Sequence, residues 1–314
     1  VLFIATIFVL SVFLTVSATA DDFTPAAHTA TADLQPEWSQ PNIPVNYAVE
    51  ICNDPGSADS IDEIRIYETE GYSITSVENK TGWYKAPFNP VKKHYQFTAL
   101  NDTYFIDPGE CTIFYFGAIT PEEEICNLKW KFETRDVNDL WRFLYAYTSV
   151  DGTEPSLVKT VTGPQMLNGE NVPCPNGPAE GEECWISYET NIDVSVEDEG
   201  FCEPPSGLDW CEISYRLDGS SPITIIYVEL DGNQTWSYDF NFDEDSVHEL
   251  NITCVDRAGN KLEDIEVFRV DGTEPETTKT ISDPKKIFEG VEWIDSITEI
   301  TLSAVDPDPT EEGC

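Results

Sequence analysis

The hexapeptide Val150-Asp151-Gly152-Thr153-Glu154-Pro155 returns unchanged as residues 270–275. The offset of 120 residues is about the size of one small domain, so we expect a modular chain. The likeness continues beyond each copy, because the run 192–198 is answered by 300–306, now at an offset of 108 residues. The first copy therefore carries a 12-residue insertion within 165–184, which we expect to be a surface loop.

The sequence around these repeats has the period of β-strands. Residues 192–196 and 248–254 alternate polar and apolar side chains, which is the pattern of a strand with one buried face. Turn-forming residues follow such strands at 217–220 and 258–260. Short strands separated by turns predict an all-β sandwich. The best helical candidate, 122–131, is short and lacks an amphipathic repeat.

The hexapeptides divide the chain into expected parts. These are a signal peptide at 1–20, a flexible leader at 21–36, an aromatic-rich β-sandwich domain at 37–149, a sandwich repeat at 150–270 and the start of a second repeat at 271–314. Within the first domain we expect strands at 47–50, 61–67, 95–98, 112–116 and 128–132. Its tryptophans are expected to be core residues; a sugar-binding platform is the alternative.

The two ends suggest an exported fragment of a longer protein. Residues 1–20 form an apolar run ending in Ala18-Thr19-Ala20 before two acids, which is typical of a signal peptidase site. An uncleaved membrane anchor is the alternative. The chain begins with Val1 rather than Met, and Cys314 follows soon after the second copy of the 192–198 strand, so we expect the last domain to be truncated.

Composition and charge exclude some partners. The net charge is −42 and the pI is near 4.1, so nucleic acid and anionic membranes are poor partners. Disorder is not expected, because 40% of the residues are hydrophobic and 12% are aromatic. Folding such an acidic chain increases its self-repulsion, which bound divalent cations or a salty medium would relieve.

Nine cysteines without a C-x-x-C pair favour disulfides in an oxidising compartment over a zinc site. Cys174 and Cys184 lie at the two ends of the Pro/Gly-rich insertion and are expected to pair and close that loop. The other expected pairings are Cys111 with Cys126, and one among Cys202, Cys211 and Cys254. The odd cysteine is expected to be Cys314, with Cys52 as the alternative. Four Asn-x-Ser/Thr triplets mark expected glycosylation sites at Asn79, Asn101, Asn233 and Asn251.

The hexapeptide at a domain start, with Cys254-Val255-Asp256-Arg257-Ala258-Gly259-Asn260 before the next start, resembles the tandem immunoglobulin-like (Ig-like) repeats of prokaryotic cell-surface proteins and adhesins. Residues 275–281 and 302–306 look especially like archaeal surface and surface-layer-type proteins. The resemblance covers residues 150–314. It includes the first domain only because that domain precedes the repeats and ends at the same hexapeptide. It implies tandem Ig-like β-sandwich domains in a beads-on-a-string array outside the cell.

The linkers combine proline with acids. Pro155 and Pro275 fix φ and extend the preceding residue, so each link is expected to be short and stiff. Carboxylates converging there would suit Ca²⁺, and in the resembled adhesins calcium stiffens such junctions. The alternative is that these residues only form turns and are solvated. The candidate metal-binding residues are Asp151, Glu154, Asp198, Asp256, Asn260, Asp271, Glu274 and Asp306.

The sequence offers no catalytic constellation. The three histidines are widely spaced, and no H-E-x-x-H, G-x-S-x-G or phosphate-binding glycine loop occurs. His248 begins an expected strand and is interpreted as an edge residue rather than a ligand. Acidic runs such as 182–183 and 243–245 are expected to be solvated loops rather than a glycosidase pair.

Two functions of different class remain. The first is a non-catalytic stalk or adhesin at the cell surface, whose partners are neighbouring Ig-like domains of the same chain, other surface proteins or glycans. The second is the accessory region of a secreted protease or glycosidase whose catalytic domain lies outside this sequence. Repetition of the domain unit favours the first.

Overall fold

The computed structural model describes residues 28–170, 172–174, 183–217 and 220–305. The chain forms two compact units, one made of residues up to 152 together with 201–203, and one made of the remainder. Both are all-β, and the helical content of the described residues is the single turn η1 (Asp102–Tyr104). No helix in this part of the chain has the length and apolar character needed to span a bilayer.

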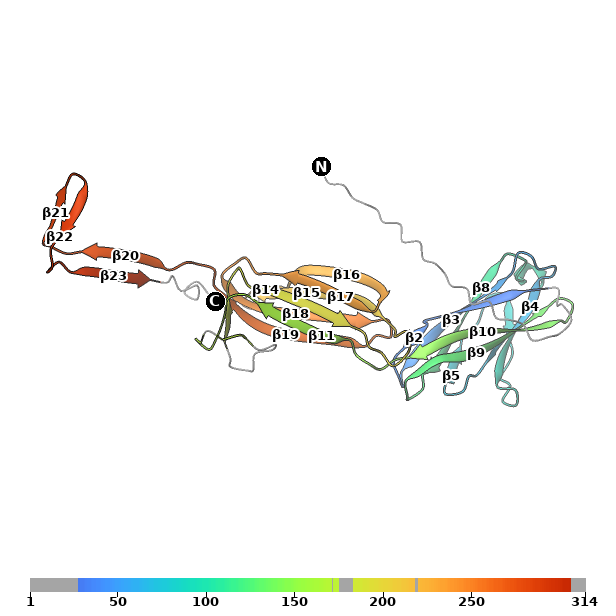
Figure 1. Ribbon diagram of the computed structural model, residues 1–314. Coiled ribbons are helices and arrows are strands. Elements are labelled where there is room, and N and C mark those ends of the chain that lie inside the picture. Colours follow the sequence, from blue (N-terminus) through green and yellow to red (C-terminus); the bar gives the residue numbers. More distant parts are fainter. Residues whose placement is uncertain (1–27, 171, 175–182, 218–219, 306–314) are drawn as a thin grey trace. The chain divides into compact units, whose positions relative to one another are not determined.

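The first unit is a sandwich of two sheets (Figure 1). One sheet has the order β1 (Ala30–Gln35), β3 (Pro44–Asn53), β8 (Cys111–Ile119) and β5 (Ser73–Val77). The other has the order β2 (Trp38–Ser39), β10 (Trp141–Val150), β9 (Ile125–Asp136), β4 (Ile61–Tyr67), β7 (His94–Ala99) and β6 (Trp83–Lys85). When β1, β3, β4, β5, β8, β9 and β10 are lettered A to G, the two sheets have the ABED and CFG strands of an immunoglobulin fold. The strands β2, β6 and β7 extend the second sheet at its edges.

Alternation along the strands builds the core of this first sandwich. On β3, Tyr47, Val49 and Ile51 are fully buried while the residues between them are half-buried. Trp130 and Phe132 on β9 face them from the other sheet, and Trp130 packs with its ring centroid 5.5 Å from that of Tyr47. Trp83 is also buried, whereas Trp38 and Trp141 are half-buried.

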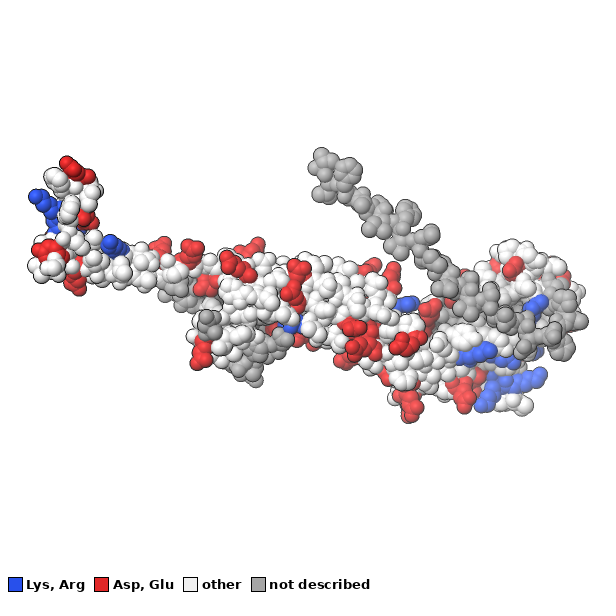
Figure 2. Space-filling view, in the orientation of Figure 1, with Lys and Arg blue, Asp and Glu red and all other residues white. Residues whose placement is uncertain are grey.

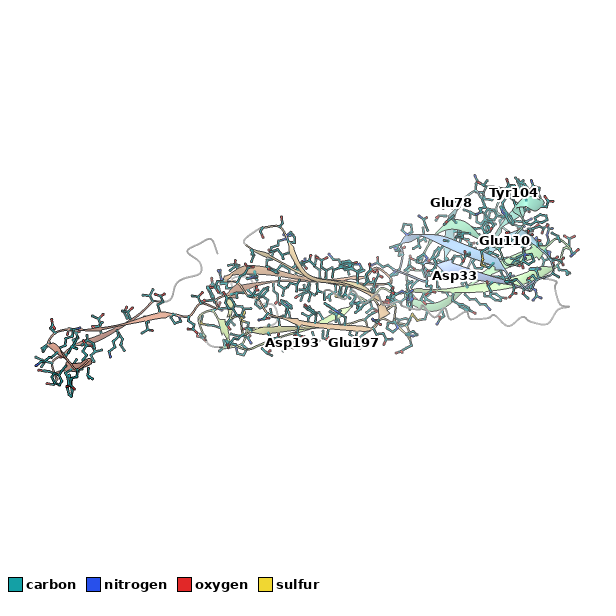
Figure 3. All side chains as sticks on the ribbon, turned by 90° about the horizontal axis from the view of Figure 1, so that it is seen from above. Asp33, Glu78, Tyr104, Glu110, Asp193 and Glu197 are labelled. Carbon is teal, nitrogen blue, oxygen red and sulfur yellow. A yellow bond between two sulfur atoms is a disulfide. The ribbon has the colours of Figure 1, made fainter. Side chains whose placement is uncertain are left out.

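The second unit repeats this architecture. Its smaller sheet has the order β11 (Ser156–Thr162), β14 (Asn191–Glu197) and β17 (Thr235–Phe240). Its larger sheet has the order β12 (Gln165–Leu167), β13 (Cys184–Ile186), β19 (Lys261–Val270), β18 (Ser246–Asp256), β15 (Leu208–Leu217) and β16 (Ile223–Asn233). On β14 the side chains alternate strictly, and Figure 3 shows Asp193 and Glu197 on the outward side of that strand.

The two sandwiches share one register. Phe132 pairs with Leu144 across β9 and β10, and 120 residues later Ile252 pairs with Asp264 across β18 and β19. The short strands β2 and β13 pair in parallel with β10 and β19 at matching positions. The first sandwich is therefore built like the second, although in the sequence the two share visibly only the hexapeptide at their ends.

Residues 276–305 copy the first half of the second sandwich. β20 (Glu276–Ile281) pairs with β23 (Ile300–Val305), and β21 (Lys285–Phe288) with β22 (Val291–Ile294), in the registers of β11 with β14 and β12 with β13. Leu302 is 68% exposed, whereas its counterpart Val194 is 1% exposed. The described residues include no second sheet over β20 and β23, which explains the difference.

Two sequence-based expectations are wrong, on the leader and on His248. The leader is not flexible up to residue 36, because β1 pairs with β3 and buries Leu34. The segment 122–131, which has only a weak helical pattern, runs into β9, in agreement with the strand expected at 128–132. His248 is not at an edge: it is fully buried on β18, between β15 and β19. The expected signal peptide lies outside the described residues.

Four disulfides are present among the described residues. Cys174 pairs with Cys184, as the insertion predicts, and Cys211 pairs with Cys254 directly across β15 and β18. The Cys111–Cys126 prediction is wrong, as is the choice of Cys52 as an alternative odd cysteine. Cys52 and Cys111 are cross-strand partners on β3 and β8, while Cys126 bonds to Cys202. Cys314 lies outside the described residues.

We predict that a fragment of residues 150–270 carrying Cys202→Ser folds as a β-rich monomer. The fragment contains every strand of the second sandwich, and the substitution removes the thiol whose partner, Cys126, lies in the first unit. Circular dichroism and amide exchange measure the outcome. An unfolded fragment, alongside a folded full chain, would show that the second sandwich is not an independent folding unit.

Candidate functional site

Asp256 organises the turn between β18 and β19. Its Oδ1 accepts hydrogen bonds from the backbone N–H groups of Gly259 (2.7 Å) and Asn260 (2.8 Å), and its Oδ2 accepts one from Nδ2 of Asn260 (2.8 Å). Gly259 has φ +95°, a left-handed conformation that glycine adopts without strain. The Asp-Arg-Ala-Gly-Asn motif is therefore a turn built around one buried carboxylate.

Asp198 follows β14 and is also buried. Its Oδ2 accepts hydrogen bonds from the backbone N–H of Gly207 (2.6 Å) and from Oγ of Ser206 (2.9 Å), and its Oδ1 accepts one from the backbone N–H of Gly200 (3.0 Å). The carboxylate thus holds the loop 198–207 against the end of the strand.

The second sandwich brings these two acids together. One carboxylate oxygen of Asp198 lies within 4.8 Å of one of Asp256. At an effective dielectric constant of 20, two unit charges at that separation repel by about 3.5 kcal/mol. The donors described above are neutral groups, which solvate the carboxylates. A bound cation would remove this repulsion.

The first sandwich arranges the corresponding end differently. Asp136, which is 120 residues before Asp256, accepts hydrogen bonds from the backbone of its own turn and contacts Nδ1 of His28 (3.0 Å). The backbone N–H of Asn53 donates to the strand opposite, as that of Asp198 does, so Asn53 occupies the Asp198 position. The first sandwich therefore places an imidazole against its carboxylate and has an asparagine at the Asp198 position, whereas the second sandwich places two carboxylates together.

The other candidate metal-binding residues differ in burial and in hydrogen-bond partners. Asp151 is buried, and its backbone N–H donates to the carbonyl of Ser39 (2.9 Å) within the first unit. Asp271 is half-buried and accepts a hydrogen bond from the backbone N–H of Thr273 (3.0 Å). Glu154 and Glu274 are exposed. Asn260 donates to Asp256, and Asp306 lies outside the described residues.

The hexapeptide glycines bind two acids that the sequence did not single out as partners. The backbone N–H of Gly152 donates to Oε1 of Glu124 (2.8 Å), and that of Gly272 donates to Oδ1 of Asp245 (2.6 Å). A Cβ on Gly272 would lie 2.2 Å from the ring of Tyr188, so only glycine fits there. Burial acts to raise the pKa of Asp245, but hydrogen bonds from Thr273 and Gly272 lower it. Asp245 thus lies in a loop, as expected, but it is half-buried and its carboxylate is hydrogen-bonded to the hexapeptide.

All three histidines are buried. His28 contacts Asp136 and, through Nε2, Oγ1 of Thr134 (3.0 Å), which superficially resembles a hydrolytic triad. The three side chains are fully or almost fully inaccessible, so they cannot reach a substrate. Burial lowers the pKa of His28, although the hydrogen bond with Asp136 acts in the opposite direction. The contact anchors the start of β1 to β9.

The outer face of β10 carries aromatic rings that are covered by cations. The guanidinium of Arg65 lies 3.6 Å from the ring centroid of Trp141, and Nζ of Lys129 lies 3.5 Å from that of Tyr145. These rings gain cation–π stabilisation, and the cations occupy the faces on which a sugar would stack. The sequon residues Asn79, Asn101 and Asn233 are exposed, and Asn251 is half-buried. Glycosylation at these asparagines stays a prediction.

No protein-family model matches the chain, and no curated protein matches it. Among solved structures, an uncharacterised Nocardia farcinica protein with an immunoglobulin-like fold has 14% identity over 36% of this chain and 81% of its own, with a TM-score of 0.28. BcpA, the major pilin subunit of Bacillus cereus, has 10% identity over 78% and 66%, and a TM-score of 0.29. The C-terminal domain of the Streptococcus agalactiae AgI/II polypeptide BspA has 12% identity over 77% and 100%, and a TM-score of 0.29. Likeness this low carries no argument about function.

We predict that stability falls as the pH drops below about 6.5. Burial lowers the folded-state pKa of His28 and His248 below the usual 6.5, so the unfolded chain takes up protons first as the pH falls. The stabilisation is complete above pH 6.5 and is lost towards the folded-state pKa values. Urea unfolding at several pH values measures this. His248→Phe should flatten the decline, whereas Glu249→Gln, an exposed change on the same strand, should not. An equal slope in His248→Phe would contradict the assignment.

Proposed function

We propose that this chain is a non-catalytic extracellular protein, a stalk or adhesin that presents Ig-like sandwiches in series at a cell surface. The observation that carries the proposal is the recurrence of one strand register at offsets of 120 and 108 residues, through the second sandwich and again in residues 276–305. Serial repetition of a folded unit extends a chain outward, whereas catalysis does not need it.

Surface chemistry supports an extracellular setting. Figure 2 shows acidic side chains scattered over the visible face of the second unit, with few basic ones among them. Such a surface stays soluble and repels its copies. The four disulfides are typical of an oxidising compartment.

We predict that an antibody raised against residues 150–270 labels intact cells of the source organism, and that mild protease treatment of those cells removes the signal. Labelling only after lysis would contradict a surface location. Labelled material confined to the culture medium and carrying hydrolase activity would instead favour the accessory region of a secreted enzyme.

We further propose that Ca²⁺ binds at Asp198 and Asp256, with Asp151 as a third ligand from the linker. Two buried carboxylates within 4.8 Å are hard oxygen donors, and their mutual repulsion favours a cation. In the first sandwich the segment leading into β1 supplies His28 to the matching carboxylate. In the second sandwich the segment leading into β11 carries Asp151, which would bring a third charge to the site and tie the linker to the fold.

We predict that calcium at 100 times its dissociation constant adds about 2.7 kcal/mol to the unfolding free energy and raises Tm by several degrees. Magnesium should have a smaller effect, because the flexible all-oxygen shell suits the larger ion. Calorimetry of the full chain in calcium, magnesium or chelator at fixed ionic strength measures this.

Two matched variants separate site binding from general screening in this measurement. Asp198→Asn keeps the shape of the side chain and should abolish most of the calcium response, whereas Asp239→Asn, at an exposed position on β17, should preserve it. Identical melts with calcium and with chelator, or a full response in Asp198→Asn, would contradict the site.

A further inference from the structure

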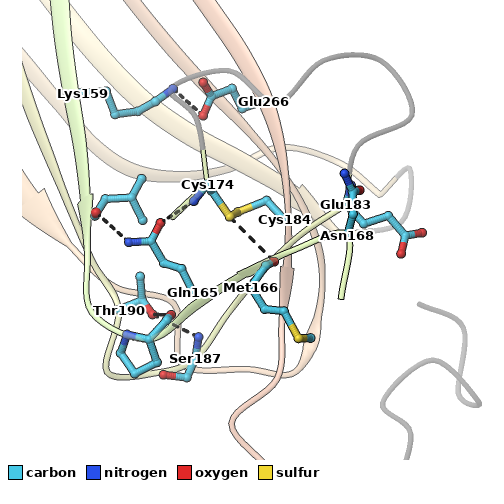
Figure 4. Close-up of a disulfide and its surroundings, with 12 residues drawn as sticks. Lys159, Gln165, Met166, Asn168, Cys174, Glu183, Cys184, Ser187, Thr190 and Glu266 are labelled. Atoms are coloured by element: carbon cyan, nitrogen blue, oxygen red, sulfur yellow. Dashed lines mark hydrogen bonds and ion pairs between the residues drawn. A yellow bond between two sulfur atoms is a disulfide. The ribbon is translucent and has the colours of Figure 1, made fainter. Parts of the chain in front are cut away.

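A lysine and two acids meet inside the second sandwich. Nζ of Lys159 lies 2.5 Å from Oδ2 of Asp264 and 2.5 Å from Oε2 of Glu266. The side chains of Lys159 and Glu266 are 3% and 4% exposed, and that of Asp264 is 29% exposed. Figure 4 shows the contact of Lys159 with Glu266 beside the Cys174–Cys184 disulfide. The amine is thus held against two carboxyl groups, largely away from water.

The three side chains join the two sheets. Lys159 is on β11 of the smaller sheet, while Asp264 and Glu266 are on β19 of the larger sheet. The acids pair across β18 with Ile252 and Leu250, both of which are fully buried. The amine and the acids therefore meet in apolar surroundings, across the interior of the sandwich.

The same three positions in the first sandwich are apolar. By strand register, Leu34 on β1 corresponds to Lys159, since Leu34 pairs with Val49 as Lys159 pairs with Val194. The positions 120 residues before Asp264 and Glu266 are Leu144 and Ala146, in the matching register of β9 with β10. All three apolar side chains are buried.

This comparison shows that the fold does not require the charges. Burying ions carries a large desolvation cost, and apolar replacements of buried ionic groups are often equally stable or more stable. The first sandwich uses such an apolar solution. A chemical role explains better than packing why the second sandwich places an amine and two acids there.

We propose that Lys159 and Asp264 form an intramolecular isopeptide bond, with Glu266 as the proton-transfer group. Nζ of the neutral amine attacks Cγ of the protonated Asp264 carboxyl group, and Glu266 accepts a proton from Nζ. Glu266 then returns the proton to the departing hydroxyl, the Cγ–O bond breaks, and water leaves. One N–C bond replaces one C–O bond, no electrons are exchanged with another reagent, and Glu266 ends unchanged.

The geometry favours Asp264 over Glu266 as the carboxyl group that is joined. Asp264 is the more exposed of the two acids, so the water that it releases has a path to solvent. Glu266 is buried, and from there it can exchange protons with Nζ at 2.5 Å. A lysine recurs 120 residues later as Lys279, which pairs with Leu302 as Lys159 pairs with Val194.

The bond would join the first strand of the second sandwich to its last. β11 follows one hexapeptide and β19 precedes the other, so tension applied between the hexapeptides would pass through the bond and bypass residues 160–263. This mechanical role rests on the proposed stalk function, whereas the chemistry of the bond does not.

Mass spectrometry of the full chain, reduced and denatured, tests the proposal. We expect the intact mass to be lower than the sequence mass by one water molecule, after correction for known processing. Digestion should yield a branched peptide that joins residues 159 and 264. The uncondensed mass together with two separate linear peptides would overturn the proposal, while a surface location of the protein would remain a separate result.

Three variants make the test specific. Lys159→Arg keeps the charge but should lack the bond. Glu266→Gln should slow bond formation after refolding by on the order of 100-fold, the size of a typical general acid–base contribution. The triple variant Lys159→Leu, Asp264→Leu and Glu266→Ala, which copies the first sandwich, should fold without the bond and serves as the folding control. Condensation in Glu266→Gln at the normal rate would contradict the role given to Glu266.

Discussion

Each sandwich depends on two sheets that present continuous buried inner faces to each other. The strict alternation of β14, with Ile192, Val194 and Val196 buried between exposed neighbours, lets a three-stranded sheet cover its partner. A one-residue slip of the register would expose these side chains and bury the charges between them. The positions of the hairpin turns, the cross-strand disulfides and the buried acids all follow from this register.

The hexapeptide recurs unchanged where the backbone has little freedom. In both copies the backbone N–H of the aspartate donates to a short parallel strand, and that of the glycine donates to a carboxylate. At Gly272 any larger side chain would collide with Tyr188. The residue types in the strands are less constrained, because several different apolar side chains can fill the same buried position on the inner face of a sheet. The last two strands of each sandwich can therefore pair in the same register, at positions 120 residues apart, although their sequences are visibly different.

The sequence predicted what depends on local pattern. Period-two alternation located β4 at 61–67 and β14 near 192–198, and the insertion placed Cys174 near Cys184. It failed where partners are distant in the chain: Cys126 bonds to a cysteine 76 residues away. It also failed to predict that His248 and Lys159 would be buried, because polar residue types usually indicate exposure. Asp198 and Asp256 were predicted only as two of eight candidate metal-binding residues, whereas Asp245 was expected to be solvated.

Native-state amide hydrogen exchange of the full chain tests the shared sandwich architecture most directly. The amides of Phe132 and Ile252, 120 residues apart on central strands, should be among the slowest to exchange in their respective units. Amides of β20 and β23, whose apolar side chains are exposed, should exchange much faster. Exchange of β9 and β18 at the rate of loops, or equal protection of β18 and β23, would contradict the shared sandwich architecture.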